Sequence, residues 1–402
     1  MQRVERHIIV DSDALNELTF KAKNLYNVAN YDIRQTFIFT GLMPSEYDLT
    51  TFFANINQPD YRALPAQTSQ QVIKLLFKNW TSYFAAIREW KKNPSKFQGM
   101  PKIPNYKKKN GHFVAIFTNQ QVKIKEGFIH FPKAVNISPM KTSVSKPKQV
   151  RIIPQATCFV VEVVYEKEVQ KVETLPDSFV SIDLGLNNLA TSFNNVGLAP
   201  FIVNGKPLKS INTWFNKNKA KLQSQLPKGI FSTRRINHLT HKRHQKINDY
   251  IHKTSRFIVD YCVENKIGTI IIGNNEGWKN RINIGKRNNQ NFVQIPHTQL
   301  IRSIEYKAEE FGIGVKITEE SYTSKTDNLV LEPLKKHGSN QSKKPSLGKR
   351  VKRGLFQSSN GRLINADCNG AIGIARKVVG DLALKPIIDK SIALMPRHRF
   401  SF

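Results

Sequence analysis

The sequence predicts a multidomain chain that combines α+β and α/β parts, and three observations lead to this prediction. The chain has 402 residues, enough for two or three domains. Helical apolar spacing and then short alternating stretches fill its first half. From Ser178 onward, strand patterns and helix patterns take turns, as they do in α/β domains.

Two long helices are predicted near the N-terminus. In residues 12–39, apolar residues recur on one helical stripe, and Ser12 and Asp13 are suitable caps at its start. The stripe consists of Leu15, Leu18, Ala22, Leu25, Ala29 and Ile33. A second helix is predicted over residues 65–90, after a loop with Asn, Pro and Asp. We expect the two helices to pack as an antiparallel hairpin.

A basic loop and a small β domain are predicted next. Residues 91–112 interleave lysines with Pro, Gly and the aromatics Phe97 and Tyr106, which excludes a helix. The composition fits a solvated loop and a surface for single-stranded nucleic acid equally well, since bases stack on aromatic rings. Residues 113–168 are typical of short strands in a small barrel or sandwich, and the early segment "VERHIIV" has the character of a further strand.

The remainder predicts an α/β domain with a mixed sheet. The stretch "FVSIDLGLNNLATSFNN" indicates a strand, a tight turn and a strand, and two helices follow, the second over about 233–266. Gly268 ends that helix, and the strand "TIIIG" comes next. A helix over about 299–311 and the strand "GVKITEE" continue the alternation.

The charge balance indicates a polyanionic partner. The chain has 62 Lys and Arg against 30 Asp and Glu, a net charge of +32. Nucleic acid fits this balance better than a membrane does, because no apolar run approaches the roughly 18 residues of a spanning helix. Charged residues interrupt the start, "MQRVERHIIVD", so we expect no signal peptide and a prokaryotic, cytoplasmic protein.

The three cysteines, Cys158, Cys262 and Cys368, predict neither disulfides nor a local zinc site. They lie about a hundred residues apart, without a CxxC pair or a Cys/His cluster. We expect three small, buried, apolar side chains.

Two aspartates occupy positions suited to a metal site. Asp183 ends an apolar strand before a turn with Gly185, where an aspartate is also a common turn former. Asp367 begins a helix, where capping and the helix dipole would explain a carboxylate equally well. Its small neighbours Gly370 and Ala371 would let that helix lie close against a sheet. Phosphodiester cleavage with two Mg²⁺ needs three or four carboxylates from separate elements, so these two form a partial set.

The motifs resemble a known family. "SIDLGLNNLAT" and "INADCNGA" resemble the first and third motifs of a RuvC-like nuclease of the RNase H superfamily. Together with "IIIGNNEGWK", "QIPHTQLIRSIEYKAEEFGI", "EESYTSKTDNL" and "KRVKRGLFQSSNGRLINADCNGA", in that order and behind a basic N-terminal half, they resemble TnpB. This transposon-encoded OrfB family is ancestral to type V CRISPR effectors. The resemblance spans nearly the whole chain and is densest from Ser178 to Val378.

The resemblance implies an RNA-guided DNA endonuclease, encoded by an insertion-sequence transposon, that cuts beside a transposon-adjacent motif with two Mg²⁺ ions. The partners implied are a guide RNA from the transposon end and target double-stranded DNA, at the nucleoid, with no membrane and no small-molecule substrate. A helical recognition lobe, residues 12–90, would be inserted in a small β-barrel (wedge) domain, residues 1–11 and 91–177. An RNase H-like (RuvC) nuclease domain, residues 178–402, would follow, with a basic target-binding insert at about 326–362.

The sequence departs from the family at two places. Most TnpB proteins carry a glutamate at the end of the second-motif strand, where this chain has Gly273. Most also carry a four-cysteine zinc insert before the third motif, but residues 326–362 contain no cysteine, so we expect no structural zinc. The insert is basic instead, with Lys343, Lys344, Lys349, Arg350, Lys352 and Arg353. Its Ser/Lys-rich middle fits a solvated loop as well as it fits a phosphate grip.

Three acids compete for the role of the missing glutamate. Glu276 lies in the turn past Gly273. Glu319 and Glu320 end the strand "VKITEE", and strand neighbours point to opposite faces, so only one of them can face the site. A TnpB subgroup with "GxN..W" at the second motif resembles this chain and carries a glutamate directly before Ser/Ala-Tyr-Thr-Ser, which favours Glu320.

The expected catalytic and metal-ligating residues are therefore Asp183, Glu320 and Asp367. The expected nucleic-acid-binding residues are Tyr322, Ser324, Lys325, Arg350 and Arg353. The main alternative is a nuclease-inactive, RNA-guided DNA-binding transcriptional repressor, indicated by Gly273 and by the missing zinc insert. A transposase that joins DNA ends is compatible with the fold but not with the family. A Holliday-junction resolvase would leave the basic N-terminal half without a role.

Overall fold

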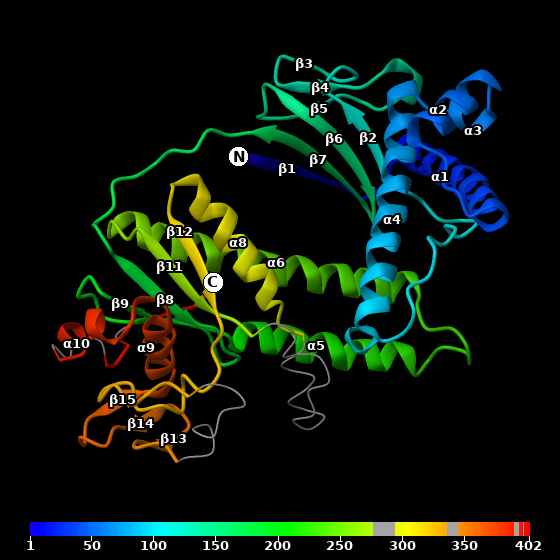
Figure 1. The fold of residues 1–402 in the computed structure, drawn as a ribbon. Helices are drawn as coiled ribbons and strands as arrows, with labels where there is room; N and C mark the ends of the chain where they lie inside the picture. Colours follow the sequence, from blue (N-terminus) through cyan, green and yellow to red (C-terminus); the bar gives the residue numbers. More distant parts are fainter. Residues whose placement is uncertain (276–293, 336–344, 390–393, 397) are drawn as a thin grey trace. The chain divides into compact units, whose positions relative to one another are not determined.

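The chain divides into two compact units, Met1–Lys167 and Glu168–Phe402 (Figure 1). The computed structural model describes residues 1–275, 294–335, 345–389, 394–396 and 398–402. The sequence placed this boundary after residue 177, and the separation of the first unit into wedge and recognition domains remains a prediction. None of the described helices combines the length and the apolar character needed to cross a bilayer.

The helical part of the first unit consists of α1 (Asp13–Thr40), α2 (Glu46–Asn55), α3 (Pro59–Arg62) and α4 (Ala66–Lys92). Helices α1 and α4 are the two that the apolar stripes predict, and they share one core. The buried Trp80 indole of α4 donates a hydrogen bond to Asn30 of α1 at 3.1 Å. The stretch between them, predicted as a loop, contains α2 and α3, because Ser45 and Gln58 accept N–H groups at their starts.

The strands of the first unit form two sheets. The larger is antiparallel in the order β1-β7-β6-β2, and its first strand is the predicted early one. Its strands are β1 (Gln2–Ile9), β2 (Ala115–Thr118), β6 (Pro147–Pro154) and β7 (Phe159–Glu166). The smaller has the order β3-β4-β5, with β3 (Lys123–Lys125), β4 (Phe128–His130) and β5 (Met140–Lys141). Short 3₁₀ turns lie at Pro94–Lys96 and Lys133–Val135. A closed barrel remains a prediction.

The basic loop before β2 is fastened to α1. Asn27 accepts a hydrogen bond from the Lys107 N–H at 2.7 Å and donates one to the Lys107 carbonyl at 3.0 Å. Asn30 donates to the Pro104 carbonyl at 3.0 Å. Tyr106 is exposed, with the Arg34 guanidinium 4.7 Å from its ring centre. The nucleic-acid role of this loop remains one of two open predictions.

The second unit is built on a six-stranded mixed sheet in the order β12-β11-β8-β9-β10-β16. Strands β8, β11 and β12 are parallel neighbours, β9 is antiparallel to β8 and β10, and β16 runs parallel to β10. The strands are β8 (Phe179–Asp183), β9 (Asn188–Asn194), β10 (Phe201–Asn204), β11 (Thr269–Gly273), β12 (Gly314–Thr318) and β16 (His398–Phe400). The mixed sheet predicted from Ser178 onward is thus present.

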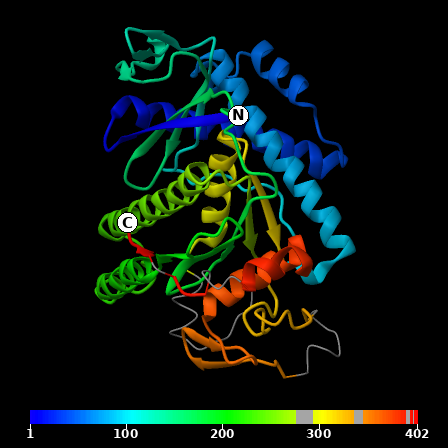
Figure 2. The same cartoon turned by 90° about the vertical axis from the view of Figure 1, so that its left-hand side faces the viewer.

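Helices cover both faces of this sheet. Strand side chains alternate between faces, so Val180 and Ile182 of β8 pack in one core with α6 (Arg234–Glu264) and α8 (His297–Glu310). Phe179 lies in the other core, with α9 (Ala366–Val379) and α10 (Asp381–Asp389). Helix α5 (Lys206–Gln223) packs beside α6. Figure 2 shows the same elements turned by 90°.

A small antiparallel sheet lies beside α9, in the order β13-β14-β15. Its strands are β13 (Lys349–Lys352), β14 (Leu355–Gln357) and β15 (Leu363–Asn365), and the first two lie within the predicted basic insert. Lys343 and Lys344 lie outside the described residues. All three cysteines are buried and outside any disulfide, as expected.

Candidate active site

Asp183 is placed at the carboxyl end of β8, on the α9 face of the sheet. The period-2 alternation puts Ser181 and Asp183 on the side of Phe179. The Ser181 hydroxyl donates to the Ala371 carbonyl of α9 at 2.8 Å, which fixes the helix against the strand. A Cβ at position 370 would collide with the Asp183 carboxylate, so only glycine permits this approach.

Asp367 enters the same region from the first turn of α9. Asn365 caps the helix by accepting the N–H groups of Asp367 and Cys368 at 3.0 and 3.2 Å. Asn188, at the start of β9, donates to Asp367 Oδ2 at 2.6 Å. Arg399 of β16 in turn donates to the Asn188 amide oxygen at 2.6 Å. The Asp367 carboxylate is therefore oriented from a strand next to the one that carries Asp183.

Glu320 comes from the turn that follows β12. Strand β12 pairs with β11 up to Thr318 opposite Gly273. The Glu320 N–H donates to the Asn275 side chain at 3.0 Å, which ties this turn to the end of β11. Glu320 Oε2 is buried, has no hydrogen-bond partner among the described residues, and lies 2.8 Å from the place of a Cβ at position 273.

Glu319, one of the two competing acids, is not at this place. Glu319 is 55% exposed and forms an ion pair with Lys377 of α9 at 2.7 Å. Lys377 also donates to the Ser321 carbonyl, which holds the turn with Glu319 outward. Glu276 lies outside the described residues. Among the described acids after the second motif, Glu320 is thus the one against Gly273.

The carboxylates influence one another electrostatically. Burial raises the pKa of Asp183 well above its usual range, and the charges of Glu320 and Asp367 raise it further, while Arg350 opposes them. Burial raises the pKa of Glu320 to about 7, with Glu319 adding to the shift and Lys377 opposing it. Cations at this place would relieve the repulsion between the acids and lower both pKa values.

The donor set suits a hard divalent cation. Three carboxylates reach one face of the sheet from β8, from the turn after β12 and from α9, and Glu320 has an unpaired oxygen there. Within the described residues, no group of three or more His, Cys, Asp and Glu side chains is assembled for a metal ion. Mg²⁺ does not require such a cage, because it is usually bound by one or two carboxylates plus water and substrate phosphates.

The predicted nucleic-acid-binding residues lie on two segments. Tyr322, Ser324 and Lys325 are in the turn after Glu320, and Tyr322 has a left-handed backbone with φ 64°. Ser324 lies near the place where the Asp183 carboxylate meets α9, because its Cβ would be 3.7 Å from a Cβ added at Gly370. The positive charge of Arg350 on β13 works to lower the pKa of Asp183. Arg353 is exposed and lies in the turn after β13.

The turn that carries these residues is anchored to α9 by buried amides. Asn369 donates to the Thr326 carbonyl at 2.8 Å, and Asn328 donates to the Asn369 carbonyl at 2.9 Å. Arg376, also buried, donates to the Asn328 amide oxygen at 2.8 Å. A Cβ added at Gly373 would lie 2.8 Å from Thr323 Cβ. The turn therefore packs directly on the face of α9 that carries this glycine.

Sequence reasoning missed several supporting residues. Asn188, Asn275 and Lys377 each hold a candidate acid or its turn, as described above. Asn188 lies within the quoted first motif, directly after the glycine turn, and its position there was the one available signal. Arg399 had none, because its pairing with Asn188 spans 211 residues.

Comparisons with known proteins agree with this architecture. A family model described as a probable transposase (OrfB_IS605) matches residues 162–279, and one described as the Cas12f1-like TNB domain matches residues 297–374. A curated relative, the TnpB-like protein ORF457 of Acidianus two-tailed virus, is 25% identical over 225 residues. That match covers 53% of this chain and 45% of the relative, so it spans less than half of the relative's length.

Solved structures are similar to the chain in fold. A Cas12f1–sgRNA–target DNA complex aligns with TM-score 0.54 and 16% identity, covering 90% of this chain and 81% of the other. The mini-RNA-guided endonuclease CRISPR-Cas_phi3 aligns with TM-score 0.47 and 10% identity, covering 95% and 93%.

The fold is thus a multidomain α/β architecture that resembles the Cas12f and TnpB-like effectors. The two family models, in their order along the chain, and the TnpB-like relative are similar to the chain over parts of its length. Over these matched regions the chain is similar to the TnpB family.

Proposed function

We propose that the chain is an RNA-guided DNA endonuclease, encoded by an insertion-sequence transposon, that hydrolyses target DNA beside a transposon-adjacent motif. One observation carries this proposal. The Glu320 carboxylate reaches Gly273, the position where most TnpB proteins carry the second acid. Its negative charge also raises the pKa of Asp183. In this proposal the site has three carboxylates, Asp183, Glu320 and Asp367, although the second-motif strand ends in Gly273.

The strand order supports an RNase H-like (RuvC) nuclease domain. Three antiparallel strands, β8 to β10, are followed by β11 and β12, which add in parallel on the other side of β8. The first acid ends the central strand, and the last begins a helix on one face, so separate elements supply the ligands. In this proposal the first unit contains the wedge and recognition domains, and β13–β15 belong to a target-binding insert without zinc.

Two Mg²⁺ ions fit the donor set and would stabilise the attacking and leaving oxygens of an in-line displacement. Asp183, Glu320 and Asp367 would hold them, with substrate phosphate completing the coordination. Asn188 keeps the Asp367 carboxylate in place, and Asn275 fixes the Glu320 backbone. Arg350 lies close enough to Asp183 for its positive charge to affect the pKa of that carboxyl. It is therefore suited to bind a DNA phosphate beside Asp183.

The net charge of +32 supports guide RNA and target double-stranded DNA as partners, in the prokaryotic cytoplasm at the nucleoid. Guide pairing would select the target sequence, and the protein would bind the backbone and recognise the adjacent motif. The Cas12f1 structure with similar fold is a complex with guide RNA and target DNA, which is consistent with these partners.

The test is expression with the flanking locus, followed by sequencing of the RNA that copurifies. Plasmid carrying the matching target beside a randomised flank is then incubated with the complex and Mg²⁺. We expect flank-dependent cutting that is lost in Asp183→Ala and Glu320→Ala and kept in the matched control Glu319→Ala. Wild-type cutting by Glu320→Ala would contradict the assignment of the displaced acid.

Gly273 also motivates a second candidate, a nuclease-inactive, RNA-guided DNA-binding transcriptional repressor. The same complex distinguishes the two. Guided binding to the target plasmid without cutting, at Mg²⁺ concentrations that saturate the site, would favour the repressor. Binding of Mn²⁺ to the wild type but not to Asp183→Ala, followed by its paramagnetic signal, would show separately whether the carboxylates hold a cation.

A further inference from the structure

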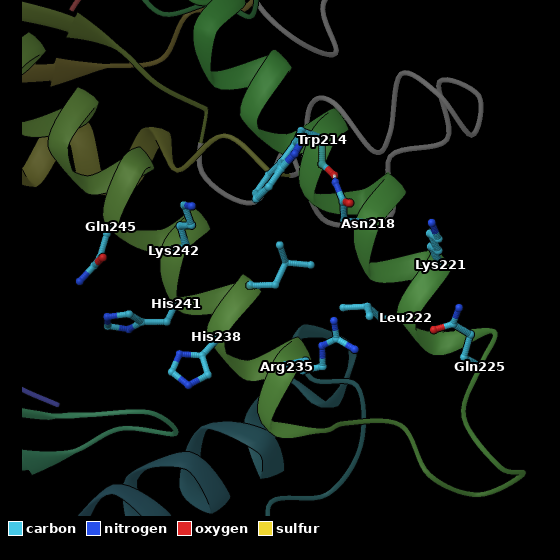
Figure 3. A pocket seen from close by; sticks show the side chains of 11 residues that line it. Trp214, Asn218, Lys221, Leu222, Gln225, Arg235, His238, His241, Lys242 and Gln245 are labelled. Carbon is cyan, nitrogen blue, oxygen red and sulfur yellow. The ribbon is translucent and has the colours of Figure 1, made fainter. Parts of the chain in front are cut away.

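Helices α5 and α6 enclose an open groove in the second unit, with a volume of about 960 Å³. Figure 3 shows its lining, to which both α5 and α6 contribute side chains. The two helices are fixed relative to one another by Arg243, whose Nε donates to Asn212 at 2.8 Å and whose guanidinium lies 5.2 Å from the Phe215 ring centre. These contacts join the two helices that line the groove.

The lining of the groove is basic. Lys221 of α5 and Arg235 and Lys242 of α6 contribute positive charge, His238 and His241 add imidazole rings, and none of the lining residues is acidic. Residues 235, 238 and 242 recur at the spacing of one helical face, so the charges form a row along α6. Such a row fits a chain of phosphates better than it fits a single small anion.

One aromatic ring lies in this basic groove. Trp214 is 41% exposed, although a large apolar ring gains by being buried. Lys246 Nζ lies 5.6 Å from its ring centre, and Lys221 is two helical turns further along α5. An exposed indole between lysines can stack an unpaired base while the neighbouring cations bind its phosphates. A base-paired duplex has no free base face to offer, so this pattern favours a single strand.

We propose that the α5–α6 groove binds a single-stranded segment of nucleic acid, with one base on Trp214 and phosphates on Lys221, Arg235 and Lys242. The inference builds on the proposed function and adds a binding site for an unpaired strand to it. Helix α6 packs on the sheet face opposite to α9. The groove is thus separate from the three carboxylates. Displaced DNA and unpaired guide RNA share the chemistry that it recognises.

The test uses the full chain and two probes, an oligothymidine and an oligouridine of equal length, each carrying one photoreactive 5-iodouracil base. Mass spectrometry locates the cross-links, and fluorescence anisotropy measures affinity across a salt series. We expect cross-links at Trp214 and a roughly tenfold weaker Kd for Trp214→Ala, with affinity largely restored in Trp214→Phe. Lys221→Ala with Lys242→Ala should reduce the slope of log K against log salt by about 0.7 for each lost contact.

The matched control is Lys217→Ala on α5, an exposed lysine outside the groove lining, which should leave the cross-link at Trp214 and change Kd less than Trp214→Ala does. The stronger of the two probes identifies the DNA or the RNA strand as the occupant. Cross-links that all fall outside α5 and α6, or an unchanged Kd in Trp214→Ala, would overturn the inference. Because this assay needs no cleavage, groove binding without guided cutting would contradict the proposed endonuclease alone.

Discussion

Glu320 Oε2 lies 2.8 Å from the place that a Cβ at Gly273 would occupy. The strand that lacks the acid and the turn that supplies one thus meet at a single point. Because Gly273 at the end of β11 has no side chain, there is space there for the Glu320 carboxylate from the turn after β12. Ile374 of α9 closes the other side, with its Cδ1 2.5 Å from the same place.

Replacing Gly273 by alanine should therefore destabilise the second unit and displace Glu320. The added methyl would overlap both Ile374 and the carboxylate, and overpacking of this kind costs about 1–3 kcal/mol. Urea unfolding measures the stability, and plasmid cleavage measures the displacement. Gly354→Ala is the matched control, since a Cβ there meets nothing within 4 Å. Equal effects of the two substitutions would contradict the steric account.

The buried Asp327 carboxylate should be a main support of the segment between β12 and α9. It accepts hydrogen bonds from the Ser358 hydroxyl at 2.7 Å and from the Ser359 N–H and hydroxyl at 2.7 and 3.0 Å. Asp327→Asn turns one acceptor into a donor facing donors, so we expect a loss of about 2–4 kcal/mol, measured as a lower melting temperature. Ser359→Ala should give a smaller loss.

Metal removal distinguishes the hydrogen bonds of Asp327 with Ser358 and Ser359 from a structural zinc site. A zinc-selective chelator should leave the melting temperature of the wild type unchanged, because residues 326–362 contain no cysteine and Asp327 is satisfied by serines. A chelator-induced drop comparable to that of Asp327→Asn would contradict this account.

Local patterns predicted most of the elements that position the site. Alternation along β8 and the first turn of α9 depend on near neighbours, so Asp183 and Asp367 were assigned to separate elements of one domain without any knowledge of the fold. Their approach to each other depends on Gly370, whose small size was visible in the sequence. Helices α2 and α3 were missed because their capping residues occur in a segment rich in loop formers.

The direction of Glu320 could not be derived from strand alternation, although the sequence favoured that residue. Strand β12 ends at Thr318, so Glu319 and Glu320 lie in a turn, and contacts from other elements set their directions. Lys377 of α9 holds Glu319 outward, and Asn275 beyond β11 holds the Glu320 backbone. Strand β16 was also missed, since three residues pairing with β10 leave no periodic pattern.

Asn188 should act as a positioning residue for Asp367. Asn188→Ala removes the donor at 2.6 Å from the carboxylate, and we expect target cleavage to fall about 10- to 100-fold. The required Mg²⁺ concentration should rise as well, which a purely structural defect would not cause. Arg399→Ala should shift both quantities in the same direction by less, because Arg399 acts through Asn188. Wild-type Mg²⁺ dependence in Asn188→Ala would contradict this role.

Glu5 should make the stability of the first unit sensitive to acid. Burial alone would raise its pKa, but hydrogen bonds from Ser143 and Thr142 outweigh burial and lower the pKa from 4.5 to about 2. A depressed carboxyl pKa stabilises the fold above the unfolded value, and that contribution is lost as the pH falls from about 4.5 toward 2.

The expected contribution is on the order of 1–2 kcal/mol, less than the full shift implies, because the side chain is 21% exposed and partly screened. Glu5→Gln should thus lower the urea midpoint near neutral pH and differ little from the wild type near pH 2. Glu17→Gln, a 66% exposed acid of α1, is the control and should change the midpoint little at either pH. A Glu5→Gln deficit that stays constant down to the lowest pH would show that the carboxylate charge is not what stabilises this sheet.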